Sequence, residues 1–66
     1  MTITLNGESK SIENATGLLA LMAMYELNPE ATAVQYNDDI LERDVYASIT
    51  LSDGDRVELI RIVGGG

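Results

Sequence analysis

The sequence predicts an α+β domain in which one main helix packs across one face of a mixed sheet of four to five strands. Two patterns predict it. Apolar and polar residues alternate near both ends of the chain, and one stretch between them has helical spacing of its apolar residues. A chain of 66 residues forms one domain at most. A domain this short leaves little room for a deep pocket, which argues against a self-contained enzyme.

The first elements predict a β-hairpin. Residues 1–5 alternate with Ile3 and Leu5 on the inward side. Asn6-Gly7 favours a tight turn because both residues tolerate a positive φ. Residues 9–13 then return as a weaker strand, with Ile12 as its clearest core residue.

A helix is expected after the hairpin. Thr16 is placed to cap a helix that begins at residue 17 or 18. Pro29 disfavours helical geometry in the residue before it, so the helix should end within residues 27–29. Its predicted buried stripe consists of Leu18, Leu21, Met22 and Tyr25.

Shorter elements are expected in the middle of the chain. Residues 32–36 read as a strand with Val34 and Tyr36 inward, and residues 37–39 read as a turn before a short return at 40–41. Residues 43–47 favour a single helical turn that buries either Val45 or Tyr46.

A second tight turn precedes the last strand. Gly54 lies between Asp53 and Asp55, and both carboxylates are expected to be solvated, because a Ca²⁺ loop needs further ligands that this chain lacks. Residues 56–63 form the longest strand candidate. In this order of elements the first and last strands pair in parallel at the centre of the sheet, which is the β-grasp arrangement. We expect residues 1–63 to form this β-grasp domain and residues 64–66 to form a flexible glycine tail.

Alternation along the last strand places Val57 and Leu59 on the helix side and Ile60 and Ile62 on the other. A single helix covers only one face of a sheet. Ile60 and Ile62 are therefore either an exposed apolar patch for a partner protein, or are accommodated by a bulge or by cover from residues 43–48.

Composition excludes several classes of function. Eleven Asp and Glu outnumber four Lys and Arg, so the formal net charge is −7 and neither nucleic acid nor a membrane surface is an expected partner. The chain has no Cys and no His, which removes disulfides and imidazole catalysis and leaves no expected metal site or bound cofactor. The longest apolar run, residues 18–25, is shorter than a membrane span, and no basic leader precedes it, so we expect a cytoplasmic protein.

Three consecutive glycines, Gly64, Gly65 and Gly66, follow the last strand. Such a segment is costly to order, so it is either a frayed end without function or a thin arm that carries one reactive group, the α-carboxylate of Gly66. A partner enzyme that holds ATP and Mg²⁺ can adenylate a carboxylate, and a sulfur nucleophile can then displace AMP to leave a thiocarboxylate. A narrow arm without side chains suits entry into a closed active site.

Several segments occur together in the order of a known family: Ile3 through Glu8, Leu18-Leu19, Leu27 through Glu30, Ala33-Val34, Asn37 through Ile40, Arg43, Tyr46, Asp53 through Glu58, and Val63 through Gly66. With them the chain resembles the ThiS family, the ubiquitin-like sulfur-carrier proteins of thiamine biosynthesis. Glu42 departs from the pattern, because many relatives have Pro before the Arg.

The resemblance implies a protein co-substrate rather than an enzyme. Gly66 is the residue that is adenylated and converted to the thiocarboxylate, and Gly65 is its neighbour in the diglycine end. The implied partners are a ThiF-like adenylyltransferase that uses ATP and Mg²⁺, a sulfur donor protein, and a ThiG-like thiazole synthase. Three alternatives remain: the small subunit of molybdopterin synthase, a ubiquitin-like modifier that is joined to lysines, and a binding module with an inert tail.

Overall fold

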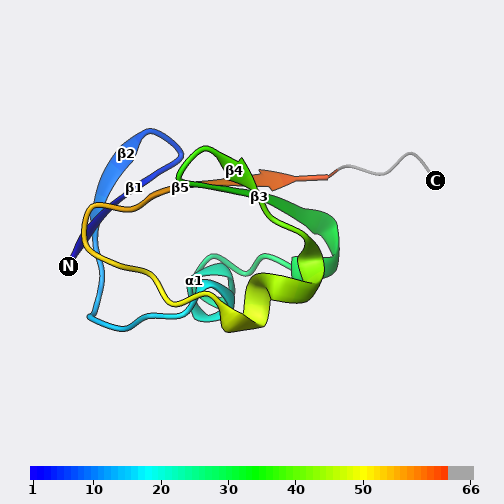
Figure 1. The fold of residues 1–66 in the computed structure, drawn as a ribbon, viewed down its shortest axis with the longest axis horizontal. Coiled ribbons are helices and arrows are strands. Elements are labelled where there is room, and N and C mark those ends of the chain that lie inside the picture. The colour runs from blue at the N-terminus through cyan, green and yellow to red at the C-terminus, as the bar shows by residue number, and fades with distance from the viewer. Residues whose placement is uncertain (63–66) are drawn as a thin grey trace.

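The computed structural model describes residues 1–62 of the chain. Along these residues the elements are β1 (Thr2–Leu5), β2 (Glu8–Ser11), helix α1 (Leu18–Met24), the 3₁₀ helix η1 (Pro29–Ala31), β3 (Thr32–Tyr36), β4 (Asp39–Ile40), the 3₁₀ helix η2 (Arg43–Ser48) and β5 (Arg56–Arg61). The strands form one five-stranded sheet in the order β2-β1-β5-β3-β4 (Figure 1). The predicted α+β fold with a mixed sheet is confirmed.

The first and last strands lie beside each other and run parallel, as predicted. Thr4 pairs with Arg56 and Leu5 with Val57. All other neighbouring strands of the sheet are antiparallel. The contact between the two central segments continues past the end of β1, because the backbone N–H of Leu59 donates a hydrogen bond to Oδ1 of Asn6 at 2.8 Å.

Two tight turns connect the antiparallel pairs at the sheet edges. Asn6 and Gly7 have φ values of 50° and 82°, and Asn37 and Asp38 have φ values of 48° and 73°. Positive φ at both central residues is what a two-residue type I′ hairpin requires, and Asn, Asp and Gly tolerate it best. Both turns were predictable from these residue types.

Helix α1 is shorter than predicted, because it ends at Met24, several residues before Pro29. Glu26 adopts a φ of 56°, its N–H bonds to the Ala23 carbonyl, and the N–H of Leu27 bonds to the Met22 carbonyl at 2.9 Å. This pair of bonds is a Schellman motif, which closes a helix with one left-handed residue. Tyr25 consequently lies past the last helical turn and is 43% exposed, so the prediction that it belongs to the buried stripe is wrong.

The predicted cap at the start of α1 is also wrong. The Thr16 hydroxyl donates to the Glu13 carbonyl at 2.7 Å, and Gly17 is the N-cap residue, with no side-chain hydrogen bond. The first turn is held instead by the loop after η2, because the N–H of Leu18 donates to the Ile49 carbonyl at 3.0 Å.

The core lies on one face of the sheet, between the strands and the helices α1 and η2, which both lie on that side (Figure 1). Tyr46, rather than Val45, is the buried residue of η2. The core residues come from almost every element: Ile3, Leu5, Ile12, Leu18, Leu21, Met22, Val34, Tyr46, Leu51, Val57 and Leu59.

The opposite face of the sheet is uncovered. Ile60 is 53% exposed and Ile62 is 49% exposed. The β3–β5 register is continuous from Thr32–Arg61 to Tyr36–Val57, so no bulge interrupts it. Since η2 packs on the core side, it does not cover Ile60 or Ile62. Of the two alternatives, exposure is the one that the structure shows, and a bulge or cover by residues 43–48 is wrong; a partner on this face stays a prediction.

Candidate functional site

The residues predicted to carry the chemistry, Gly64, Gly65 and Gly66, lie outside the described residues. Their role and the boundary between domain and tail therefore stay predictions. The structure describes the body from which this segment continues. Three features of that body bear on function: the end of β5, the two polar networks at the ends of β3, and the uncovered face of the sheet.

The end of β5 is fastened to the start of β3 and to η1. Arg61 stands opposite Thr32 in the antiparallel register. One residue further on, the N–H of Ile62 donates to the Ala31 carbonyl at 2.8 Å. Backbone pairing with the segment around η1 thus continues to the last described residue.

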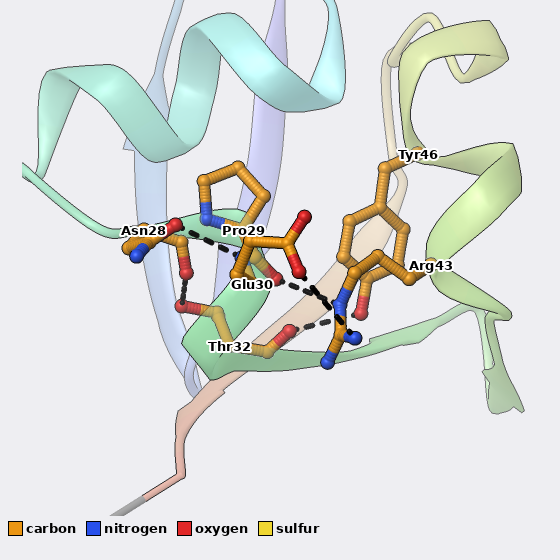
Figure 2. A network of polar contacts seen from close by, with 6 residues as sticks. All are labelled: Asn28, Pro29, Glu30, Thr32, Arg43 and Tyr46. Carbon is orange, nitrogen blue, oxygen red and sulfur yellow. Dashed lines mark hydrogen bonds and ion pairs between the residues drawn. The ribbon is translucent and has the colours of Figure 1, made fainter.

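A set of polar contacts surrounds the start of β3, and we call it the η1 network (Figure 2). The Tyr46 hydroxyl donates to the Thr32 carbonyl at 2.9 Å, and this hydrogen bond is buried. The Thr32 hydroxyl donates to the Asn28 carbonyl at 2.8 Å, while Oδ1 of Asn28 accepts the Glu30 N–H at 3.0 Å. The residues of the network are Asn28, Pro29, Glu30, Thr32, Arg43 and Tyr46.

Arg43 connects η2 to η1 from the solvent side. Its Nε donates to the Pro29 carbonyl at 3.2 Å, and its guanidinium lies 3.8 Å from the Glu30 carboxylate. Both side chains of this ion pair are exposed, so the pair itself is worth about 0–1 kcal/mol. The hydrogen bond to a backbone carbonyl is the more directional part of the contact.

A second set of polar contacts, the Asp55 cluster, holds the other end of β3. Its residues are Tyr36, Asn37, Ser52 and Asp55. Oδ2 of Asp55 accepts the Tyr36 hydroxyl at 2.6 Å and the Ser52 N–H at 2.8 Å, and Oδ1 accepts the side-chain amide of Asn37 at 3.1 Å. Asp55 is only 8% exposed, so the prediction that it is a solvated turn carboxylate is wrong.

The cluster perturbs the pKa of both of its titratable groups. Burial raises the pKa of the Asp55 carboxyl, but the hydrogen bonds from Tyr36, Ser52 and Asn37 outweigh burial, so the net pKa lies below its usual value. The hydrogen bond to Asp55, together with burial and the Asp55 charge, raises the pKa of Tyr36 to about 12. No gap in the cluster is open to a substrate, and the contacts fasten the β3–β4 turn to the turn before β5.

The uncovered face of the sheet divides into an apolar part and a polar part. Ile60 lies opposite Ala33, and Ile62 follows towards residue 63. Towards the start of the same strand, Glu58 lies opposite Gln35, and Arg56 forms an ion pair with Asp38. The apolar part is therefore the part of this face next to the chain segment that leads to the glycines.

Metal-ligating clusters and membrane-spanning helices are both absent from the described part of the chain. Within residues 1–62 there is no group of three or more metal-ligating side chains that could hold an ion. Among the same residues, no helix combines the length and the apolar character needed to cross a membrane.

The family follows from sequence comparison. A model of the ThiS family matches residues 3–66, which is nearly the whole chain and includes the three glycines. The chain belongs to the ThiS family. The resemblance inferred from the sequence is thus confirmed.

Relatives within and around the ThiS family agree in sequence and in fold. The sulfur carrier protein ThiS of Bacillus subtilis is 32% identical over 65 residues, which are 97% of this chain and 98% of that protein. The crystal structure of the thiamine biosynthesis protein ThiS of Geobacter metallireducens superposes with a TM-score of 0.84 at 29% identity and covers both chains completely. A thiazole synthase of Magnetococcus marinus is 35% identical over all 66 residues, but the chain spans only 20% of that protein's length.

Proposed function

We propose that this ThiS-family chain is a sulfur carrier of thiamine biosynthesis and acts as a protein co-substrate rather than an enzyme. The observation that carries the proposal is the family match, which extends through the glycines to residue 66. The similar Bacillus subtilis protein, of nearly the same length, is a sulfur carrier by name. A carrier in the cytoplasm, where its partner enzymes would meet it, is part of the same proposal.

The chemistry takes place at the α-carboxylate of Gly66. A carboxylate oxygen attacks the α-phosphate of ATP, pyrophosphate leaves, and an acyl-adenylate forms in the active site of a ThiF-like adenylyltransferase. The terminal sulfur of a persulfide on a donor protein then attacks the carbonyl carbon, and AMP leaves to give an acyl persulfide. A partner thiol attacks the other sulfur of that persulfide and breaks the S–S bond, which releases the thiocarboxylate and leaves a disulfide on the partner proteins. Because the chain contains no His and no Cys, the acid–base and thiol groups come from its partners, as do ATP and Mg²⁺.

The uncovered sheet face is the proposed docking surface for these partners. Ile60 and Ile62 are both about half exposed, and they lie next to the segment that the enzyme must receive. The chain as a whole is strongly acidic, with a formal net charge of −7. A complementary partner surface is therefore apolar where it meets Ile60 and Ile62, and a basic partner protein is attracted over longer range, so encounter should slow as the salt concentration rises.

A ThiG-like thiazole synthase is the proposed acceptor of the sulfur. A stretch similar to the whole of this chain forms part of the thiazole synthases of Magnetococcus marinus and Paramagnetospirillum magneticum. Two activities that share one polypeptide in some organisms are good candidates for association as separate proteins in others.

The test is an intact-mass measurement after incubation with the cognate adenylyltransferase, ATP and a sulfur donor. The full chain is expected to exchange one oxygen for one sulfur. A variant that lacks Gly65 and Gly66 should keep its fold and accept no sulfur. Sulfur on the truncated variant, or none on the full chain with every cognate partner, contradicts the proposal.

Genetic rescue then chooses the pathway. The gene is expected to restore growth to a thiamine auxotroph that lacks its own ThiS. Rescue of a strain deficient in molybdenum cofactor instead would assign the chain to the alternative pathway, that of molybdopterin synthase.

A further inference from the structure

The C-terminal end of β5 is held by backbone contacts with the segment 28–32. Ile62 donates its N–H to the Ala31 carbonyl, and Arg61 lies opposite Thr32. Any displacement of this segment moves the point from which residue 63 continues. The contacts that hold this segment in place therefore also hold Ile62, from which the chain continues to the glycines.

No residue of η1 belongs to the hydrophobic core. None of its residues, Pro29–Ala31, is buried. Glu30 is exposed and Pro29 and Ala31 are half-buried, and a 3₁₀ turn of this length has little intrinsic stability, because its hydrogen-bond geometry is poor. Contacts made by its backbone therefore help to fix its position, and the η1 network supplies them.

Tyr46 supplies the buried contact of this network. Strand β4 stops early, and its continuation past Ile40 ends with the N–H of Leu41 bonded to the Val34 carbonyl. The Thr32 carbonyl lies beyond this point, where β3 has lost its outer neighbour. The Tyr46 hydroxyl takes the place of the missing strand at 2.9 Å, and only 4% of Tyr46 is exposed. Without that hydroxyl the carbonyl keeps no partner in a site shielded from water.

Arg43 supplies the contact on the solvent side. Its Nε bonds to the Pro29 carbonyl, while Tyr46, one turn further along η2, bonds to the carbonyl of Thr32. Two side chains of one short helix thus hold both ends of η1. Figure 2 shows them reaching from η2 towards the segment 28–32.

We propose that Tyr46 and Arg43 are positioning residues for sulfur loading: through the segment 28–32 they fix the end of β5 and Ile62, from which the chain continues to Gly66. The inference rests on the proposed function. A partner that docks on the sheet face must receive the Gly66 carboxylate in its active site, and small errors in the placement of a reacting group cost large factors in rate.

The first test measures hydrogen exchange of individual amides by NMR. In Tyr46→Phe and in Arg43→Ala, exchange of the Ile62 amide is expected to accelerate by roughly fivefold, the factor that one ordinary hydrogen bond represents. The Leu59 amide of the same strand bonds to Asn6 instead and serves as the internal reference. Arg43 is on the surface, so Arg43→Ala keeps the test valid if Tyr46→Phe folds poorly.

The second test measures the rate of thiocarboxylate formation with the cognate adenylyltransferase. Both variants are expected to lose about fivefold in kcat with an unchanged KM for the carrier, because the docking face is intact. The matched control is Tyr36→Phe, which removes a tyrosine hydroxyl bond at the opposite end of the same strand. It should lower stability while leaving both Ile62 exchange and kcat at their wild-type values.

The outcomes separate the two proposals. If the wild type accepts no sulfur, the proposed function fails, and Ile62 exchange still reports on the support of β5. If the wild type accepts sulfur while both variants keep a wild-type kcat, or if Ile62 exchange stays unchanged in both, the positioning role is overturned and the carrier function stands. An equal loss of kcat in Tyr36→Phe also overturns it, because a general loss of stability would then explain the effect.

Discussion

The two ends of β3 are held by polar contacts of different kinds. At the Tyr36 end, the Asp55 cluster gathers three donors around one buried carboxylate. At the Thr32 end, the η1 network consists mainly of hydrogen bonds to backbone carbonyls. The first joins two turns at the start of β5, and the second lies at the end of β5. A buried carboxylate makes stability sensitive to pH, whereas hydrogen bonds to backbone carbonyls have acceptors that carry no charge.

The largest effect is expected from removal of the charge. Asp55→Ala leaves the Tyr36 hydroxyl, the Asn37 amide and the Ser52 N–H without their acceptor, so we expect a loss of roughly 2–4 kcal/mol in the free energy of unfolding. Denaturant unfolding measures it. The matched control is Asp53→Ala in the same turn, where Oδ1 accepts the exposed Thr2 N–H, and its cost should stay below about 1 kcal/mol. Equal losses in the two variants would show that burial of Asp55 contributes nothing special.

The comparison sharpens when pH is varied. The pKa of Asp55 is lower in the folded chain than in the unfolded chain, so its stabilisation is fully present above about pH 4 and is lost as the pH falls through the folded-state value. Tyr36 acts in the opposite sense. Its pKa is raised from 10.0 to about 12, so its contribution is present below pH 10 and disappears as the pH rises towards 12. Unfolding free energies of the wild type and Asp55→Asn across pH measure the acid limb, and a constant difference between them would contradict it.

A smaller and pH-independent effect is expected at the other end of the strand. Tyr46→Phe leaves the Thr32 carbonyl unpaired and should cost about 1–2 kcal/mol. This bond contains no carboxylate, so the loss should be the same at acidic and at neutral pH. A loss that grew or shrank with acid would mean that the two networks are coupled through β3.

The smallest effect is expected at Glu42, which precedes η2. Its φ of −72° is one that proline adopts, and within residues 1–62 its N–H donates no hydrogen bond. Glu42→Pro should therefore stabilise the fold by about 0.4–1 kcal/mol, mainly by restricting the unfolded chain. Thermal unfolding measures the gain. Loss of stability in this variant would show that the start of η2, and with it the placement of Arg43, needs a freedom that proline removes.

Local signals made most of the fold predictable. The Asn6-Gly7 turn, the strand at residues 32–36 and the exposed Ile60 and Ile62 follow from side-chain alternation and turn chemistry, which act over a few residues. The end of α1 did not follow, because Glu26 occupies a left-handed position at which the usual signal is Gly or Asn.

The two networks were harder to foresee because they depend on long-range contacts. In the sequence, Asp55 looks like any carboxylate in a turn. Only in the folded chain does the β3–β5 register place Tyr36 and Asn37 beside it. For the η1 network, the sequence left Val45 and Tyr46 as alternatives for burial and gave no indication that the Tyr46 hydroxyl would reach the Thr32 carbonyl. The glycine arm was recognised from its composition and from the family resemblance, not from any contact.

The central claim is that this acidic domain presents the carboxyl group of Gly66 to the catalytic sites of other proteins. Mass spectrometry of the intact protein, isolated from the cells that produce it and fragmented to locate the modification, tests it most directly. The account predicts a mature chain whose last residue is Gly66, with part of the population carrying sulfur in place of one oxygen at that residue. A mature polypeptide that continues past Gly66, or sulfur located anywhere else in the chain, would contradict it.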